Sequence, residues 1–369
     1  MSSSAAEPEV GDGTSLLSGD VLLFFVSHPE RPEWVDRISK RFGLRVRWVN
    51  SIREDKSVVN ISELSPALFD GVTLFCTYMP APAELIPKVR FVQLTSAGAD
   101  KWLGHPKYRE ESTVFCTSNG VQSPQIAEWV IGAWLSHQHH FPRYQSYMKT
   151  GFWEGPFEQH FQDSTSQRIG ILGYGAIGRQ CARLASALGM EVYAYTRSQR
   201  STPESRKDDS YCVPGTGDPD GLLPARWFHG ASRAAVDDFL GQNLDLLVVS
   251  LPLTSETRHV VGRAQLAILG ATKKAFVANV GRGGHVDQEA LVEALEAGRI
   301  RGAALDVTDP EPLPAEHPLW RAPNLLITPH VSWRTDVLWD RLMDVIETNL
   351  ERLARGRPLI NVMNRQLHY

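Results

Sequence analysis

Residues 168–200 constrain the fold of this chain more than any other stretch, because a glycine pattern is combined there with regular apolar spacing. A short apolar run, Ile169–Leu172, leads into Gly173-Tyr174-Gly175-Ala176-Ile177-Gly178. Apolar residues then recur at helical spacing as far as Leu188, and a second apolar run follows at 191–195. Gly189 stands where a left-handed helix cap is expected. We predict a β-α-β unit here.

The spacing of the three glycines is typical of a turn that binds the pyrophosphate of a dinucleotide. Gly173 would allow the tight bend, Gly175 would let the backbone approach the phosphates, and Gly178 would let the helix pack closely on the strand. The helix N-terminus adds free N–H groups and a positive dipole end. The pattern alone also fits ordinary turns, but the strand before it and the helix after it are the context that such a site requires. The predicted cofactor-binding residues in this turn are Gly173, Gly175, Ala176, Ile177 and Gly178.

The end of the second strand indicates which dinucleotide binds. An NAD site usually has an acid about 20 residues beyond the first glycine, which binds the ribose hydroxyls. The sequence Thr196-Arg197-Ser198-Gln199-Arg200 has none. Its arginines and serine could instead hold a 2′-phosphate, and a hydrogen bond to a charged group contributes roughly 1.5–3 kcal/mol. We therefore predict that Thr196, Arg197, Ser198 and Arg200 favour NADP(H), with NAD(H) possible; a solvated basic loop is the alternative.

Length and composition narrow the class of protein. The 369 residues allow two domains, and 42% hydrophobic residues with a net charge of −4 are typical of a soluble protein without a nucleic-acid or membrane partner. Four scattered cysteines resemble buried thiols of a reducing, cytoplasmic compartment. No apolar span is long enough to cross a bilayer. Residues 1–19 lack the features of a signal peptide, and we expect a disordered tail.

Short apolar runs alternate with helical segments from Val21 onwards. The first array covers about 120 residues and ends in a small-residue turn, 95–100, where backbone N–H groups could face an anion. A helix is expected at 32–42 and another at 124–136, and strands are expected at 21–26, 44–49, 74–76 and 91–94. His137, His139 and His140 could suggest a metal, but no acid or cysteine stands at a supporting spacing. We predict no metal site and interpret them as a polar helix end.

The second half of the chain predicts a doubly wound parallel sheet. Further strands are expected at 245–251, 275–280, 303–307 and 325–328. Residues 201–241 are rich in Pro, Gly and Asp and are interpreted as a surface insertion near the adenosine end of the site, of unknown role. Ligands of such sheets bind beyond the carboxyl ends of the strands. Four residues follow strands at that edge: Gly173, Pro252, Arg282 and His330.

Three residues at this edge could carry out chemistry. Arg282 stands between glycines and could hold a carboxylate through two hydrogen bonds. His330 could give a proton to a carbonyl oxygen during hydride transfer to a 2-keto acid. Glu311, in a loop fixed by prolines, could orient that ring and stabilise its protonated form. Each residue alone could equally be structural, as an ion pair, a solvated acid or a satisfied histidine; it is their common edge that favours a site.

From about Val21 to Asn364 the chain resembles the D-isomer-specific 2-hydroxyacid dehydrogenases, in particular glyoxylate/hydroxypyruvate reductases of the NADP-preferring type. The stretches that carry the resemblance are Ser96-Ala97-Gly98-Ala99-Asp100, Gly173–Gly178, Leu251-Pro252-Leu253-Thr254 with Thr257-Arg258, Asn279–Gly284, Asp306–Pro312 and Thr328-Pro329-His330.

The resemblance implies a fold and a set of roles. The fold is a Rossmann-type dinucleotide-binding domain, 121–333, with a smaller flavodoxin-like substrate domain that is discontinuous, 20–120 and 334–369. A helix at about 335–355 crosses back, residues 359–362 rejoin the first lobe, and a homodimer forms through 124–136. The implied catalytic residues are Arg282, Glu311 and His330. Ala97 and Gly98 would receive the substrate carboxylate together with Arg282. The remaining cofactor contacts would come from Leu251, Pro252, Thr257, Val280 and Asp306, the last two at the nicotinamide carboxamide.

Two departures leave alternatives open. The usual acid after the second strand is replaced by Thr196-Arg197, as in NADP-preferring members. Trp333 stands where many members have a small residue; it could shape the substrate pocket or pack against the hinge helix. A second class, dinucleotide-sensing scaffolds resembling the C-terminal binding protein corepressors, also has Trp shortly after the histidine. A formate dehydrogenase is disfavoured because Glu311 stands where those enzymes have Gln.

Overall fold

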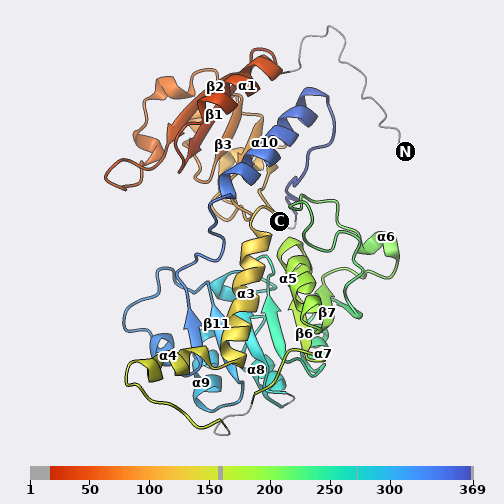
Figure 1. The fold of residues 1–369 in the computed structure, drawn as a ribbon. Helices are drawn as coiled ribbons and strands as arrows, with labels where there is room; N and C mark the ends of the chain where they lie inside the picture. Colours follow the sequence, from red (N-terminus) through yellow and green to blue (C-terminus); the bar gives the residue numbers. More distant parts are fainter. Residues whose placement is uncertain (1–16, 157–160, 272, 367–369) are drawn as a thin grey trace, which may run out of the picture. The chain divides into compact units, whose positions relative to one another are not determined.

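The computed structural model describes residues 17–156, 161–271 and 273–366, which form two compact α/β units (Figure 1). Unit 1 is Met1–Ser118 with Trp339–Tyr369, and unit 2 is Asn119–Leu338. The chain thus passes from one unit to the other at 118/119 and at 338/339, a few residues from the domain boundaries expected at 120/121 and 333/334. Residues 1–16 of the expected tail lie outside the described residues, and Leu17, near its end, is fully buried.

Unit 1 is built on a five-stranded parallel sheet with the order β2-β1-β3-β4-β5, the flavodoxin-like arrangement that was expected. Its strands are β1 (Val21–Val26), β2 (Arg45–Asn50), β3 (Leu74–Thr77), β4 (Phe91–Leu94) and β5 (Val114–Cys116). Because successive side chains of a strand point to opposite faces, β1 supplies Val21, Leu23 and Phe25 to one core and Leu22, Phe24 and Val26 to the other.

The second of these cores is closed by two helices from opposite ends of the chain. They are α1 (Pro32–Phe42) and α10 (Leu338–Ala354), which bury Trp34, Ile38, Leu342 and Ile346 against the sheet. α1 has a proline in its first turn and ends at Gly43, whose φ of 67° is the left-handed cap that glycine adopts without strain. Helix α2 (Pro106–Arg109) is a single turn.

Unit 2 is built on a seven-stranded parallel sheet with the order β12-β11-β10-β9-β6-β7-β8. Its strands are β6 (Arg168–Leu172), β7 (Glu191–Thr196), β8 (Arg226–His229), β9 (Leu246–Val249), β10 (Phe276–Asn279), β11 (Gly302–Leu305) and β12 (Leu325–Ile327). Numbered in chain order, the strands follow 7-6-5-4-1-2-3, so the strand order reverses between β6 and β9. This is the Rossmann-type doubly wound sheet that was expected.

Helices cover both faces of this sheet. On one face α3 (Ser123–Gln138) and α5 (Ala176–Ala187) lie side by side (Figure 1) and bury Val130, Trp134 and Cys181 against the strands. The other face is covered by α7 (Arg233–Leu240), α8 (Arg263–Ala271) and α9 (Gln288–Glu296). Two short helices, α4 (Phe141–Met148) and α6 (Pro203–Arg206), lie outside this core. None of the helices in the described part of the chain is long and apolar enough to cross a bilayer.

Part of the expected insertion belongs to the sheet. Residues 226–229 are the edge strand β8, paired in parallel with β7, and 233–240 are α7. The irregular stretch is therefore about 202–225. The sequence Arg-Trp-Phe-His of β8 is half exposed and has no apolar run, which is why the pattern did not reveal a strand.

Asn349 of α10 ties the C-terminal helix into unit 1. Its amide nitrogen donates to Oε1 of Gln93 on β4 (2.9 Å), and its Oδ1 accepts from the N–H of Ile360 (2.9 Å). Gln93 and Asn349 are both 0% exposed. The backbone beyond reaches β5, where the N–H of Met363 donates to the carbonyl of Phe115 (2.9 Å).

We predict that Asn349→Ala lowers the free energy of unfolding by roughly 2–4 kcal/mol, because two buried polar groups lose their partners. Urea denaturation followed by circular dichroism measures this change. Thr348→Ala is the matched control, since its hydroxyl bonds within the helix, to the carbonyl of Asp344. Equal stability of both variants would contradict the role given to Asn349.

Candidate active site

The loops at the carboxyl edge of the unit 2 sheet contain most of the predicted site residues. They follow β6, β7, β9, β10, β11 and β12. Because all seven strands are parallel, these loops emerge at one edge on either side of the point where the strand order reverses. Ala97 and Gly98 belong to unit 1, in the loop after β4, where the Ser96 hydroxyl donates to the Gly98 carbonyl (2.6 Å).

The three glycines after β6 meet three different surroundings. A Cβ on Gly173, whose φ is 105°, would lie 2.8 Å from the Ser250 carbonyl oxygen. A Cβ on Gly178 would lie 2.4 Å from the carbonyl oxygen of Gly173. Beside Gly175, the N-cap of α5, a Cβ would meet nothing within 4 Å. The fold therefore needs two of the glycines, and the third faces open space, as is expected where the backbone of such a turn approaches a pyrophosphate.

The irregular stretch 202–225 is anchored on this same turn and helix. Asp218, which is 6% exposed, accepts a hydrogen bond from the hydroxyl of Tyr174 (2.7 Å), the second residue of the glycine motif. Arg179 of α5 pairs with Asp208 (3.1 Å), and its guanidinium also donates to backbone carbonyls of the stretch. Burial, and then the bond to Asp218, raise the pKa of the Tyr174 phenol. The stretch thus lies beside the glycine turn, in keeping with the position near the adenosine end of the site that the sequence indicated, although its contacts with Tyr174 and Arg179 could not be predicted.

The residues after β7 already have partners. The Thr196 hydroxyl donates to the Ser198 carbonyl (2.8 Å), and Arg200 donates to the Ser205 carbonyl (2.5 Å). Arg197 forms an ion pair with Glu256, with 2.8 Å between Nη1 and Oε2. Glu256 belongs to the turn after β9, in which the Thr257 hydroxyl donates to the Pro252 carbonyl (2.8 Å).

His330 and Glu311 are in direct contact. Nδ1 of His330 lies 2.9 Å from Oε2 of Glu311, and both side chains are about two-fifths exposed. The other carboxylate oxygen, Oε1, accepts from the N–H of Thr308 (3.1 Å). Since Glu311 occupies Nδ1, the ring nitrogen that can meet a substrate is Nε2. The pair has the geometry of a histidine acid/base with its orienting carboxylate.

Asp306 holds the loop on which His330 lies. Its Oδ1 accepts from the Thr328 hydroxyl (2.5 Å) and from the N–H of Val331 (2.9 Å). Its Oδ2 accepts from the N–H (3.0 Å) and the hydroxyl (2.5 Å) of Ser332. Asp306 is 1% exposed. The resemblance implies a contact between Asp306 and the cofactor; in the structure the carboxylate also fixes the histidine loop, where His330 has a φ of 54°.

Trp333 closes the same loop. Its indole N–H donates to the carbonyl of His330 (2.8 Å), and its own carbonyl accepts from the side chain of Gln125 at the start of α3 (2.6 Å). The side chain remains partly exposed, at 37% for the residue. Its indole nitrogen therefore takes part in positioning the histidine loop, a role that neither interpretation of the sequence included.

Arg282 follows β10 in a turn that packs on the loop of Glu311. Its guanidinium donates to the Gly281 carbonyl (2.7 Å) and its N–H donates to Nδ1 of His285 (3.0 Å). A Cβ on Gly283 would lie 1.9 Å from the backbone carbon of Thr308, so the two loops meet backbone to backbone. Val280 and Leu251 follow β10 and β9 at the same edge of the sheet. The N–H of Val280 donates to the Val249 carbonyl (3.1 Å).

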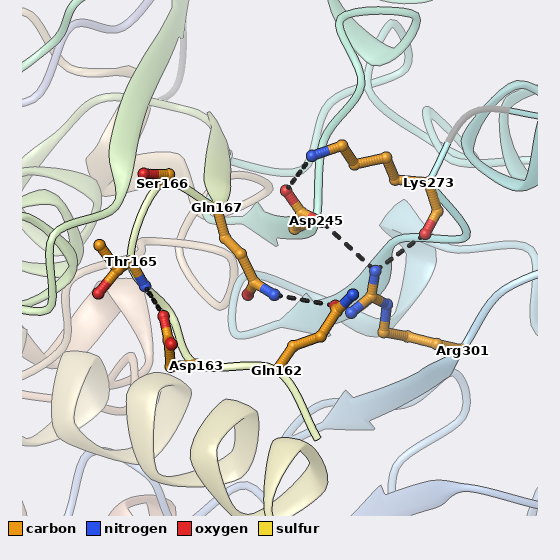
Figure 2. A pocket seen from close by; sticks show the side chains of 8 residues that line it. All are labelled: Gln162, Asp163, Thr165, Ser166, Gln167, Asp245, Lys273 and Arg301. Atoms are coloured by element: carbon orange, nitrogen blue, oxygen red, sulfur yellow. Dashed lines mark hydrogen bonds and ion pairs between the residues drawn. The ribbon is translucent and has the colours of Figure 1, made fainter. Parts of the chain in front are cut away.

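A cavity of about 570 Å³ lies at the opposite edge of this sheet. Of the residues that line it (Figure 2), Gln167, Asp245 and Arg301 directly precede β6, β9 and β11. Both cations of the cavity already pair within the protein, because Lys273 (3.3 Å) and Arg301 (3.4 Å) contact Asp245. Since ligands of doubly wound sheets bind at the carboxyl edge, and no predicted catalytic residue lines this hollow, we do not assign the active site to it.

The histidines at the end of α3 have different surroundings. His137 packs its ring 4.8 Å from that of Phe276, and burial together with Arg301 lowers its pKa to about 4. His139 stacks on Phe141. Within the described ranges no group of three His, Cys, Asp or Glu side chains is placed to hold a metal ion.

The fold and this edge are typical of oxidoreductases that use a nicotinamide dinucleotide. Residues 131–214 and 225–332 match the NAD binding domain of the D-isomer specific 2-hydroxyacid dehydrogenases. A glyoxylate/hydroxypyruvate reductase A from Klebsiella pneumoniae is 30% identical over 94% of this chain and 99% of its own length. Glyoxylate/hydroxypyruvate reductase A HPR2 from Arabidopsis thaliana is 31% identical over 76% of this chain and 81% of its own length.

A solved structure agrees with these matches. A D-isomer specific 2-hydroxyacid dehydrogenase from Xanthobacter autotrophicus, in complex with NADPH and MES, aligns with a TM-score of 0.71 and 26% identity, over 95% of this chain and 100% of that one. The chain belongs to the D-isomer specific 2-hydroxyacid dehydrogenase family.

We predict that Gly175→Ala leaves the stability unchanged within about 0.5 kcal/mol but raises the Kd of NADP and NAD at least tenfold. The added methyl group meets no protein atom, but it occupies the space beside the phosphates. Isothermal titration calorimetry and thermal unfolding measure the two quantities. Gly178→Ala is the contrasting variant, because its methyl group would clash with Gly173 and should destabilise the fold. Unchanged affinity in Gly175→Ala would place the phosphates elsewhere.

Proposed function

We propose that the protein is an NADPH-preferring reductase that converts a 2-keto acid to a D-2-hydroxy acid. The observation that carries the proposal is the His330–Glu311 pair (2.9 Å), held by Asp306 at the carboxyl edge of the dinucleotide-binding sheet. The named relatives support reduction of glyoxylate or hydroxypyruvate. They also favour an enzyme over a dinucleotide-sensing scaffold.

The residues have complementary tasks in this reaction. When bound, the reduced nicotinamide supplies the hydride that adds to the carbonyl carbon. Arg282 binds the substrate carboxylate and orients the carbonyl group. Nε2 of His330 gives its proton to the carbonyl oxygen, so that the keto group of the substrate becomes the hydroxyl group of the product. Glu311 holds Nδ1 and stabilises the imidazolium before the transfer, and in the reverse direction His330 takes the proton back.

The preference for NADPH is supported by the absence of an acid in 196–200 and by Arg197 at the end of β7. The related structure from Xanthobacter autotrophicus was solved with NADPH. In this proposal Ala97 and Gly98 contribute their backbone to substrate binding. Trp333 shapes the substrate side of the histidine loop, and Leu251, Pro252, Thr257 and Val280 line the cofactor.

The function is tested by following the absorbance of the reduced nicotinamide with NADPH and NADH in parallel. Glyoxylate, hydroxypyruvate, phenylpyruvate and 4-methyl-2-oxopentanoate form the substrate panel. We expect turnover of at least one of these acids and a higher kcat/KM with NADPH. Tight dinucleotide binding without turnover of any 2-keto acid would favour the scaffold instead.

We predict that His330→Ala lowers kcat about 10²–10⁴-fold, while the Kd of NADPH changes little, because the ring acts on the substrate. Glu311→Gln should retain part of the activity, since an amide can still orient the ring but cannot stabilise its charge. His139→Ala, an exposed histidine at the end of α3, is the control. If His330→Ala lost NADPH binding but kept its turnover number at saturation, the assignment of the acid/base would be wrong.

We further propose a homodimer and a cytoplasmic location. The interior side of 124–136 is already used within unit 2, where Ile126, Val130 and Trp134 are buried. Apolar exposure is found just beyond, with Met148 82% and Trp153 93% exposed, which favours the α4 region as the contact between subunits. The four cysteines are free thiols, in keeping with a reducing compartment.

We expect the protein to elute as a dimer in size-exclusion chromatography with light scattering. Met148→Glu with Trp153→Glu should shift it towards the monomer, because two charges replace exposed apolar side chains. Leu222→Glu, at another site with 77% exposure, is the control. A monomeric wild-type protein would contradict the proposed assembly.

A further inference from the structure

The turn after β7 lacks the acid that NAD sites usually have there, but an acid from another loop contacts this turn. Arg197 directly follows β7, at the position from which dinucleotide sites contact the adenosine ribose. Glu256 reaches it from the turn after β9. Two contacts join the side chains, 2.8 Å between Nη1 and Oε2 and 3.5 Å between Nη2 and Oε1. The Glu256 carboxylate therefore already pairs with the Arg197 guanidinium, the group that binds the 2′-phosphate in the proposed function.

Glu256 is held in place by its own turn. The hydroxyl of Thr257 donates to the Pro252 carbonyl (2.8 Å) and accepts from the N–H of Thr254 (2.8 Å). The N–H of Arg258 donates to the Thr254 carbonyl (3.0 Å). The carbonyls of Arg258 and His259 in turn accept from Arg233 of α7 (2.9 and 2.5 Å). The turn that carries Glu256 is thus itself fixed by hydrogen bonds, which favours a defined position of the acid beside Arg197.

The pair is placed where a phosphate can displace the acid. Both side chains are about half exposed, at 43% and 51%, and exposed ion pairs contribute little to stability. A phosphate monoester carries about −1.5 to −2 charges at pH 7, against one on a carboxylate, and offers three acceptor oxygens. The second arginine of the turn, Arg200, donates to the Ser205 carbonyl (2.5 Å) and is engaged with backbone.

We propose that Glu256 is a specificity-determining residue that competes with the 2′-phosphate of the cofactor for Arg197. In the free protein it holds the guanidinium; NADP(H) displaces it, whereas NAD(H), which has no 2′-phosphate, leaves the pair intact. Glu256 thereby reduces the preference for NADP(H) below what Arg197 alone would give. This inference rests on the proposed function and adds the residue that sets the degree of its cofactor preference.

The test uses two adenosine nucleotides that differ only in the 2′-phosphate, 2′,5′-ADP and 5′-AMP, which correspond to the adenosine ends of NADP and NAD. Their Kd values are measured by calorimetry for the wild type, Glu256→Gln, Arg197→Gln and the double variant. Glu256→Gln should bind 2′,5′-ADP about two- to five-fold more tightly, the range that exposed ion pairs provide, with 5′-AMP unchanged. In the Arg197→Gln background the same substitution should have no effect on 2′,5′-ADP.

Glu316→Gln is the matched control, because it also removes one negative charge from an exposed pair of unit 2, that with Arg321. It should leave both Kd values unchanged, which excludes a general effect of net charge. Thermal midpoints should agree among all variants, since the substituted side chains are exposed.

Three results would overturn the inference. The first is an unchanged Kd of 2′,5′-ADP in Glu256→Gln. The second is the same gain in the Arg197→Gln background, which would show that the acid acts only through general repulsion. The third is a weaker 5′-AMP complex in Glu256→Gln, which would make Glu256 the acceptor for the ribose hydroxyls. The proposed preference for NADPH is judged separately, by whether the wild type binds 2′,5′-ADP more tightly than 5′-AMP.

Discussion

Close approach of backbone to backbone is the constraint on which the carboxyl edge of unit 2 depends. A Cβ on Gly178 would lie 2.4 Å from the Gly173 carbonyl oxygen, and one on Gly283 would lie 1.9 Å from the backbone of Thr308. Gly120, at the start of unit 2, would meet the Tyr211 carbonyl oxygen at 1.9 Å. The first contact sets the dinucleotide turn and the second brings the Arg282 turn to the loop of Glu311. The third places the stretch 202–225 against the beginning of the unit.

Buried carboxylates then fix what the backbone brings together. Asp306 receives four donors from the loop of His330, and Asp218 receives the hydroxyl of Tyr174 together with two backbone N–H groups. Each is nearly inaccessible to solvent and is satisfied by hydrogen bonds, as a buried charge must be. The proposed acid/base His330, its partner Glu311 and the proposed phosphate-binding residue Arg197 are partly exposed. Buried carboxylates thus fix the loops, whereas different, partly exposed residues are proposed to act on substrate and cofactor.

The sequence predicted what depends on local spacing. The helix at 32–42, the glycine turn and the doubly wound parallel sheet of unit 2 follow from apolar periodicity and glycine positions, whereas the flavodoxin-like arrangement of unit 1 was implied by the resemblance. What it missed depends on contacts between distant residues. Strand β8 is half exposed and lacks an apolar run, Asp218 reaches Tyr174 across 44 positions, and Glu256 reaches Arg197 across 59. For Asp306 the resemblance suggested a cofactor contact, whereas the structure adds a local task that only the fold of 328–332 makes visible.

Affinity for a dinucleotide and choice between dinucleotides rest on different parts of this edge. In the proposed site the pyrophosphate lies against the backbone of Gly173, Gly175 and Gly178; a Cβ would clash with the protein at Gly173 and Gly178, and at Gly175 it would enter open space. The 2′-phosphate would meet exposed side chains on two loops, Arg197 and Glu256, neither of which supports the core. Because specificity is a difference between two affinities, substitutions at the 2′ position can shift it without disturbing the turn that supplies common binding energy. In our proposal the charge balance of one exposed ion pair therefore sets the choice of cofactor, while the backbone of the glycine turn contributes equally to the binding of both.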